Sequence, residues 1–474
     1  MTVDADKKLR LDQDKLPGPG DHLLWVETTS DQTLQPLRLF VPSSPAKSVP
    51  LLVVLHGMGV DHNAWFDLTP VKAAAEKYGV VLAAPLGRGN WFYRGFAEQD
   101  VLDIVRILSD SARINRNRIY LTGHSMGGWG TWWIGLRHAD LFAGICPMSG
   151  FAPAHLLANA RHLDPFIIHA ADDEVVSVKH SRRPSRLLAN QKLSFHYREE
   201  IGCGHASSLI GDNLDRIFER FLRTERASCP LRISLAARTP SRGRGWWIAM
   251  VELQEFGSVA SLDATLGTDE IRVSAANIKS FAVNASDLPE AHVSHTHVVC
   301  NESPAGAMQT GGGWHWFENA GEEWNLKTVE ALQPVPVLPG WRLEMPRCFP
   351  GYEHNDEAYD IVSRILADAA NADAVVLPAD SLLAPNGALS ADEALDVYIR
   401  PDENLGLFTW PTARLCEIAS LSVLTPLKVW RRDTNNATPH TRVLAPWEIA
   451  LRIDPLAELV HHSLPELIVQ HGCG

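Results

Sequence analysis

A lone serine inside a cluster of glycines is the feature that most constrains this chain. Residues Ile119–Trp133 read IYLTGHSMGGWGTWW, in which an apolar run typical of a strand is followed at once by a helix-forming run. The chain must turn sharply between them, and Gly123 and Gly127 give Ser125 the small neighbours that such a turn requires. The pattern G-x-S-x-G therefore predicts a nucleophile elbow. Glycine-flanked serines also occur in ordinary turns, so the prediction depends on the rest of the chain.

Strand-like and helix-like segments alternate over residues 23–221. The strand-like runs are LRLFVP, LLVVLHG, VVLAAP, IYLTG, FAGICPMSG, PFIIHA and LSFHYREE, and the helix-like runs are AAAEKYG, DVLDIVRILSDS, TWWIGLRHA, SRRPSRLLANQ and NLDRIFERFLRT. This alternation predicts an α/β fold, with helices on both faces of a mostly parallel sheet. Functional residues are then expected in loops at the carboxyl ends of the strands.

The 474 residues are more than one ordinary domain needs. We predict an α/β domain over 1–226, a β-rich module over 227–335 and a C-terminal α/β domain over 336–474. In the module, short β-like runs alternate with turns, and GGGWHWFENAG favours a hairpin or loop. In the last domain AYDIVSRILADAANA favours a helix, ADAVVLP a strand and ARLCEIASL another helix.

Composition narrows the class of partner and compartment. A net charge of -13 argues against binding to nucleic acid or an anionic membrane. The 7 cysteines include no C-x-x-C pair, which favours reduced thiols over disulfides or a zinc site. The start, MTVDADKKLRLDQDKLPGPG, has no apolar signal-peptide core, and no stretch resembles a membrane span. We expect a cytoplasmic protein that needs no cofactor and contacts neither nucleic acid nor membrane, in an oligomeric state that the sequence leaves open.

The chain also holds the partners that a nucleophilic serine needs. A serine hydroxyl requires a base to accept its proton and an acid to orient that base. The strand-like PFIIHA leads into ADDEVVSV, which places Asp172 and Asp173 at a strand end, and GCGHAS places His205 in a glycine-rich loop. The order Ser, Asp, His is that of an α/β hydrolase. The residues alone leave the choice between the two aspartates open.

The HGMG loop after the apolar run 51–55 is a candidate oxyanion site. Such a loop can direct a backbone N–H at the charge that develops on a carbonyl oxygen. We predict the N–H of Met58 as one donor and that of Met126, directly after the serine, as the other. Donors of this kind typically contribute about 2.7–4 kcal/mol each in the transition state.

Several motifs together resemble a known family. LRLFVP, LHGMG, GRGNWFYRGFAEQDVLDIV, RINRNRIYLTGHSMGGWGTW, HAADDEVVSVKHSR and GCGHAS look like an α/β-hydrolase esterase of the feruloyl-esterase and polyhydroxybutyrate-depolymerase-like group, whose members are often labelled predicted peptidases. The likeness spans 35–222 and implies Ser125 as nucleophile, Asp173 as acid and His205 as base. Asp173 is implied over Asp172 because members usually carry H-G-x-x-D-x-V-V-P-V, and this chain departs from that pattern without losing a catalytic group.

Aromatic residues concentrate in the same loops. They can line an acyl or aromatic substrate pocket, or they can pack in the core. We predict Trp65, Trp91 and Trp129 as substrate-binding residues, and favour the first two because they follow the oxyanion loop and a strand end.

Two weaker signals lie further along the chain. His295 and His297 share one face of a possible strand, but no Cys, Asp or Glu at suitable spacing supports a metal, so we predict no metal site. The segments NDEAYDIVSRILADAANADAVVLPADSLL and GALSADEALDVYIRPDENLGLFTWPTARLCEIASL resemble the C-terminal domain of 5'-nucleotidases. That family usually has P-F-x-N where this chain has residues 401–404, with Asp402 in place of the aromatic. The likeness implies a positioning or structural role only.

The favoured hypothesis is a serine hydrolase that cleaves carboxylic esters through an acyl-enzyme. The substrates would be small or polymer-linked esters, with aryl or carbohydrate-linked acyl groups as candidates. The alternatives are a serine peptidase of the same fold and a non-catalytic binding protein on a hydrolase scaffold. Aryl esters compared with matched amides would separate the first two, and the third predicts no activity on either.

Overall fold

The computed structural model describes residues 16–44, 46–111, 113–289, 296–308, 312–321, 323–330 and 336, together with the elements between 342 and 463 whose bounds are given below. The chain divides into two compact units. One comprises Met1–Gln254 and Val259–Val337, and the other Glu255–Ser258 and Leu338–Gly474.

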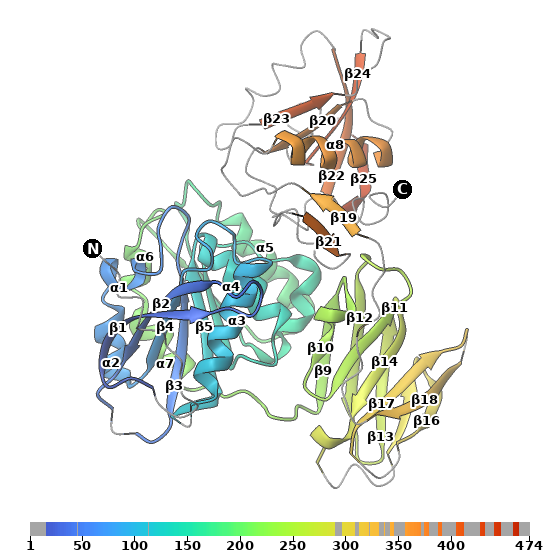
Figure 1. Cartoon of the computed structure of the whole chain (residues 1–474), viewed down its shortest axis with the longest axis horizontal. Helices are drawn as coiled ribbons and strands as arrows, with labels where there is room; N and C mark the ends of the chain where they lie inside the picture. The colour runs from blue at the N-terminus through green and yellow to red at the C-terminus, as the bar shows by residue number, and fades with distance from the viewer. Residues whose placement is uncertain are drawn as a thin grey trace. The chain divides into compact units, whose positions relative to one another are not determined.

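The large sheet of the first unit has the strand order β1-β2-β4-β3-β5-β6-β7-β8 (Figure 1). Strands β1, β2 and β4 pair antiparallel, and all pairs from β4 to β8 are parallel. This is the α/β-hydrolase fold. The strands are β1 (Gly20–Glu27), β2 (Leu34–Val41), β3 (Val49–Leu55), β4 (Val81–Pro85), β5 (Ile114–His124), β6 (Gly144–Met148), β7 (Phe166–Ala170) and β8 (His196–Glu200).

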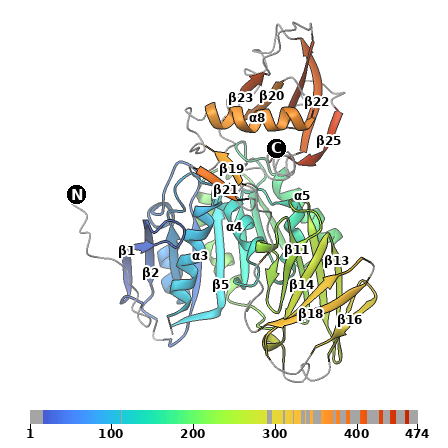
Figure 2. The same cartoon turned by 45° about the vertical axis from the view of Figure 1, so that its right-hand side comes forward.

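Helices cover both faces of this sheet (Figure 2). The helices are α1 (Ala64–Leu68), α2 (Val71–Tyr78), α3 (Phe96–Ser109), α4 (Met126–Arg137), the 3₁₀ helix η1 (Ala154–His162), α5 (Lys179–Asn190), α6 (Ser208–Gly211) and α7 (Leu214–Phe221). Alternate residues of β3 face opposite layers, since successive strand side chains point to opposite sides. Leu52 and Val54 join one core with Phe66 and Phe218, whereas the side chain of Leu55 approaches Gly130 of α4.

Every strand and helix predicted between residues 23 and 221 is present, so the predicted α/β fold is confirmed. The structure adds β1 at the edge of the sheet and the short segments α1, α6 and η1. The motif residues lie where parallel strands end, because Ser125 follows β5, Asp173 follows β7 and His205 follows β8.

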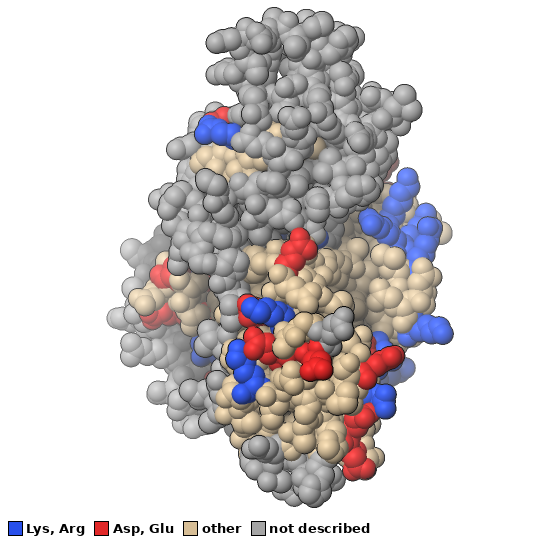
Figure 3. Space-filling view, turned by 90° about the vertical axis from the view of Figure 1, so that its right-hand side faces the viewer, with Lys and Arg blue, Asp and Glu red and all other residues tan. Residues whose placement is uncertain are grey.

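The β-rich stretch of the first unit forms sheets with the orders β10-β11-β14-β17-β18 and β16-β15-β13-β12-β9. Their elements are β9 (Arg232–Ala237), the 3₁₀ helix η2 (Pro240–Arg242), β10 (Arg244–Gly245), β11 (Ile248–Leu253), β12 (Ala260–Leu266), β13 (Glu270–Ala276), β14 (Ile278–Asn284), the 3₁₀ helix η3 (Ala285–Asp287), β15 (His297–Cys300), β16 (Ser303–Ala307), β17 (Trp314–Asn319) and β18 (Trp324–Glu330). The buried ring of Phe281 packs against those of Phe317 and Trp324, with a centroid distance of 5.2 Å to each. β17 and β18 pair antiparallel, which confirms the predicted hairpin. On the face that Figure 3 shows, acidic and basic side chains of this stretch are interspersed.

The second unit contains a sheet with the order β23-β20-β24-β22-β25, the pair β19–β21 and helix α8. The elements are β19 (Arg342–Met345), α8 (Asp356–Ala370), β20 (Ala374–Pro378), β21 (Gly387–Ser390), β22 (Asn404–Pro411), β23 (Leu427–Arg431), β24 (His440–Pro446) and β25 (Glu458–Ser463). The first predicted helix and the strand after it are confirmed, while the helix predicted over ARLCEIASL and residues 401–403 lie outside the described residues. Within the described part, no helix has the length and apolarity of a membrane span.

Candidate active site

Ser125 sits in a strained turn between β5 and α4. Its backbone has φ 60° and ψ -119°, and residues other than glycine rarely adopt such a positive φ. Its N–H donates to the carbonyl oxygen of Met148 at 2.9 Å. A Cβ on Gly127 would overlap the carbonyl oxygen of Leu55, so the helix can begin this close to β3 only with glycine there. The turn has the geometry predicted for a nucleophile elbow.

The structure brings Ser125, His205 and Asp173 into one hydrogen-bonded chain. The Ser125 Oγ lies 2.9 Å from Nε2 of His205. The other ring nitrogen, Nδ1, lies 2.7 Å from Oδ2 of Asp173. An ionised carboxylate only accepts hydrogen bonds, so Nδ1 carries the proton and Nε2 of the neutral ring accepts from the serine hydroxyl. This is the arrangement in which a histidine can take the serine proton.

The carboxylate of Asp173 is buried and held on both oxygens. Oδ1 accepts from the backbone N–H groups of Val175 at 3.0 Å and Val176 at 2.8 Å. Burial by itself raises the pKa of Asp173, but the hydrogen bonds from His205 and Val176 outweigh it and hold that pKa below its ordinary value. Asp173 is therefore ionised and oriented at neutral pH.

Asp172, the other candidate acid, faces a different group. Its carboxylate oxygens accept from the backbone N–H groups of Gly202 at 3.0 Å and Gly204 at 3.2 Å. Both glycines have positive φ, in the turn that leads from β8 to His205. Of the two aspartates, Asp173 contacts the imidazole and Asp172 secures the loop that carries it.

The HGMG loop lies against the serine, and three side chains form hydrogen bonds to this loop and to Leu55 directly before it. Tyr93 donates to the carbonyl oxygen of His56 at 3.1 Å, Trp65 donates to that of Leu55 at 2.9 Å, and Asn90 accepts from the N–H of Gly59 at 2.9 Å. The sequence did not predict that Asn90 and Tyr93 bind the HGMG loop, because both residues lie far from that loop along the chain.

The two predicted oxyanion donors are available in this arrangement. Met58 lies in the loop beside Ser125 and Met126 begins α4, where the first backbone N–H groups have no partner within the helix. Neither N–H forms a hydrogen bond within the described part of the chain.

A pocket of about 200 Å³ opens beside the serine hydroxyl. It is lined by Gly57, Met58, Val60, Ala64, Trp65, Leu68, Thr69, His124, Ser125, His205, Ser207 and Ile210. No Asp, Glu, Lys or Arg is among these residues, and Met58, Val60 and Leu68 are exposed at 48%, 42% and 62%. Exposed apolar side chains next to a cavity are typical of a ligand-binding site.

The three tryptophans predicted to bind substrate lie in different surroundings. Trp65 lines the pocket, but Trp91 and Trp129 do not. Trp129 is buried within α4, where its ring stacks on Phe151 at 4.5 Å between centroids, so it fills the core. Trp91 is half-buried and stacks on Phe96 at 6.3 Å. The apolar lining comes instead from α1 and from residues 57–60.

His124 is a pocket residue that sequence reasoning missed. Its ring centroid is 4.7 Å from that of His205, and its buried Nε2 has no hydrogen-bond partner among the described residues. Burial, with a smaller contribution from His205, lowers the pKa of His124 to about 4, so the ring is neutral at neutral pH. In the sequence, only the position of His124 between Gly123 and Ser125 could have indicated that its side chain lies near the site.

Of the two histidines that the sequence placed on one face of a possible strand, the structure describes one. His297 is exposed at the start of β15, and His295 lies outside the described residues. Among the described residues, no group of three His, Cys, Asp or Glu is placed to hold a metal ion.

Comparisons with known proteins agree with this fold. A model of the prolyl oligopeptidase family matches residues 87–167, which include Ser125 but end before Asp173 and His205. A bifunctional acetylxylan esterase/xylanase from Neocallimastix patriciarum is 29% identical over 164 residues, covering 34% of this chain and 24% of the relative. The chain thus matches about a quarter of that relative's length.

Solved structures similar to this chain include serine hydrolases. A thermostable esterase is 26% identical and covers 44% of this chain and 63% of its own, with a TM-score of 0.39. A fluorophosphonate-binding serine hydrolase of Staphylococcus aureus is 16% identical and covers 44% and 99%, with a TM-score of 0.40. The strand order is that of an α/β-hydrolase fold, and the sequence matches to the prolyl oligopeptidase model and to the acetylxylan esterase/xylanase extend no further than the coverage given above.

Proposed function

We propose that this protein is a serine esterase that cleaves carboxylic esters through an acyl-enzyme. The observation that carries the proposal is the hydrogen-bonded chain from Ser125 through His205 to Asp173. His205 takes the hydroxyl proton as Oγ bonds to the ester carbonyl carbon, and Asp173 stabilises the resulting imidazolium. His205 then returns the proton to the departing alcohol. A water molecule, activated by the same histidine, hydrolyses the acyl-enzyme and releases the acid.

The negative charge of each tetrahedral intermediate falls on the former carbonyl oxygen. The N–H groups of Met58 and Met126 are the donors that we assign to it, since both lie beside Ser125 and have no other partner in the described part. Tyr93, Asn90 and Trp65 fix the first donor's loop before substrate arrives. Donors that are already in position need no reorganisation during the reaction.

The pocket suggests a short, uncharged acyl group. Its lining contains no ionised side chain, so a charged acyl group would lose hydration without gaining a partner there. A volume of about 200 Å³ suits an acetyl or similarly short chain better than a long one. The acetylxylan esterase among the relatives makes a carbohydrate-linked acetyl ester a specific candidate. Relative rates on acetyl, octanoyl and succinyl esters of one alcohol test this, with the acetyl ester expected to be fastest.

A serine peptidase remains the second candidate, because the matching family model is that of the prolyl oligopeptidases. Peptide cleavage uses the same residues but requires His205 to protonate a poorer leaving group. A p-nitrophenyl ester compared with the matched p-nitroanilide separates the two, and we expect turnover of the ester alone.

Covalent labelling tests the nucleophile directly. A fluorophosphonate probe should modify Ser125, as identified by mass spectrometry of the digested protein. Ser207 provides the control, because it lines the same pocket but lies outside the hydrogen-bonded chain. A probe adduct on Ser207, or no adduct at all, would contradict the proposal. The latter result would favour a binding protein on a hydrolase scaffold.

A further inference from the structure

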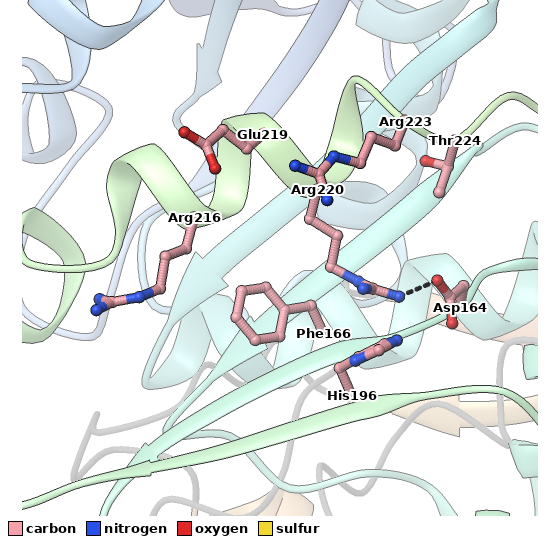
Figure 4. A pocket seen from close by; sticks show the side chains of 8 residues that line it. All are labelled: Asp164, Phe166, His196, Arg216, Glu219, Arg220, Arg223 and Thr224. Carbon is pink, nitrogen blue, oxygen red and sulfur yellow. Dashed lines mark hydrogen bonds and ion pairs between the residues drawn. The ribbon is translucent and has the colours of Figure 1, made fainter.

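A second pocket, of about 330 Å³, lies at the amino ends of β7 and β8, and Figure 4 shows the side chains that line it. Phe166 and His196 are the first residues of β7 and β8, whereas Asp173 and His205 follow the carboxyl ends of those strands. Residues of helix α7 form one wall of this second pocket. The second pocket and the pocket beside Ser125 have no lining residue in common.

Arginines from α7 surround an apolar floor. In Figure 4 the side chains of Arg216 and Arg220 descend from the helix on either side of the Phe166 ring, and His196 lies beneath it. The guanidinium of Arg220 lies over that ring at 5.9 Å from the centroid. Arg223, two residues after α7 ends, is the third arginine among the lining residues.

The carboxylates near the pocket are already engaged. Asp164 pairs with Arg220 through Oδ2 and accepts from the Ser194 hydroxyl through Oδ1 at 2.6 Å. Glu219 accepts from Tyr78 at 3.3 Å, and Figure 4 shows its carboxylate directed away from Phe166. The two carboxylates at this pocket therefore already accept hydrogen bonds from other side chains of the protein.

The arginine side chains, in contrast, keep N–H groups for which no hydrogen bond is found among the described residues. Arg220 uses only Nη2, and its buried Nε–H has no hydrogen-bond partner among the described residues. Arg216 uses only Nη1, which donates to the carbonyl oxygen of Asp212 at 3.1 Å and to Asn213 at 3.3 Å. Arg216 is exposed, so of these two side chains only the Nε–H of Arg220 is a buried donor without a partner in the described part of the chain. Such a donor is costly, and an anionic ligand would supply the missing acceptor.

We propose that this pocket binds a carboxylate that carries an apolar body. Three arginines and two carboxylates line the pocket, and this excess of one arginine charge over the carboxylates suits a monoanion. The second negative charge of a phosphate dianion would exceed this excess. The planar guanidinium fork matches a carboxylate, and the Phe166 ring gives the rest of the ligand an apolar surface. This proposal does not rest on the proposed function, whose favoured product, acetate, has no comparable apolar body.

Calorimetric titration of the full-length protein with benzoate, acetate and inorganic phosphate at constant ionic strength tests the proposal. Benzoate should bind at one site and more tightly than acetate, because only benzoate can cover Phe166. Arg216→Gln should weaken benzoate binding about tenfold or more, as expected for loss of a charge-assisted contact. Arg223→Gln should weaken it less. Neither variant removes the pair between Arg220 and Asp164, so both should fold.

Two further variants locate the binding. Arg183→Gln removes an exposed arginine of α5 that does not line the pocket, and it should leave benzoate binding unchanged. Ser125→Ala should also bind benzoate normally. Equal binding by wild type and Arg216→Gln would overturn the proposal, as would phosphate binding more tightly than benzoate. Benzoate binding without any esterase activity would count against the proposed function and leave this site standing.

Discussion

Asp172 and Asp173 are neighbours in the chain, yet they hold different groups. Asp173 accepts from His205 at 2.7 Å, whereas Asp172 accepts from Gly202 and Gly204 at 3.0 and 3.2 Å. The residues alone left the choice open because both aspartates follow the same strand. The turn after β7 decides which side chain reaches the imidazole, and the resemblance to known esterases pointed to the same residue through its motif register.

Substitution of each aspartate should separate the two roles. Asp173→Asn should lower kcat about 10⁴-fold, since an amide favours the wrong tautomer of the histidine. Asp172→Asn should lower kcat only about tenfold, because one hydrogen bond to the loop survives and the triad is intact. Steady-state kinetics on a p-nitrophenyl ester measures both. Losses of equal size would contradict the assignment of separate roles.

His124 should make the protein less stable in mild acid. The folded ring keeps its pKa at about 4 against an ordinary 6.5, so the unfolded chain binds a proton first. Stability should therefore fall as the pH drops from 6.5 to 4, by about 3 kcal/mol from this ring. His124→Gln should remove that part of the pH dependence, as measured by denaturant unfolding at several pH values.

An exposed histidine provides the comparison. His297→Gln should leave the pH dependence of unfolding unchanged. If His124→Gln and wild type lost stability in parallel between pH 6.5 and pH 4, the ring would not be the neutral group described above.

At the scale of elements, the buried strands were predictable and the pocket was not. β3, β4, β6 and β7 are buried along their whole length and mostly apolar, because both faces of a parallel sheet are covered. The edge strand β1 is half-exposed and mixed in composition, so its sequence carries little signal. The sequence did not show that Trp129 lies in the core, because α4 is buried on nearly every side and an all-round apolar helix does not reveal which residues face a pocket.

The junction of α4 with β3 should not tolerate a side chain at Gly127. The Cβ of Gly127→Ala would overlap the carbonyl oxygen of Leu55, which is backbone within a central strand and cannot move aside. We expect a loss of about 3 kcal/mol or more in the free energy of unfolding, at the upper end for overpacking. Denaturant unfolding measures the loss.

Gly211 in α6 is the matched control for this substitution. A Cβ there would lie 3.7 Å from Pro70, an ordinary contact, and alanine favours a helix over glycine. Gly211→Ala should unfold at the wild-type denaturant concentration or above. A Gly127→Ala protein as stable as Gly211→Ala would show that α4 can move away from β3.

At the scale of the whole molecule, the hydrolase sheet and the β-rich stretch share a hydrogen-bonded contact within one unit. Asn159 of η1 is buried and bonds both backbone groups of Ala236 in β9, at 2.6 and 3.0 Å. The buried Glu98 of α3 pairs with Arg137 at 3.1 Å and lies 3.9 Å from Arg242 of η2. No sequence pattern indicated these contacts, since they join residues far apart in the chain.

This contact should make the two parts unfold together. Asn159→Asp would place a carboxylate against the carbonyl oxygens of Leu136 and Ala236, and should cost about 3 kcal/mol. Calorimetry should show a lower Tm or a transition split in two. Asn301 makes the same pair of bonds to Ala275, at 2.9 and 3.0 Å, but exposed and inside the β-rich stretch. Equal shifts for Asn159→Asp and Asn301→Asp would contradict a special role for the buried contact.

The most direct test of the catalytic assignment is the hydrolysis of p-nitrophenyl acetate by wild type, Ser125→Ala and Ser207→Ala. Loss of a triad serine typically removes several powers of ten in kcat. We predict a fall of about 10⁴-fold or more for Ser125→Ala and near-wild-type turnover for Ser207→Ala. Equal turnover by wild type and Ser125→Ala would mean that the glycine-flanked serine is a strained turn and not the nucleophile.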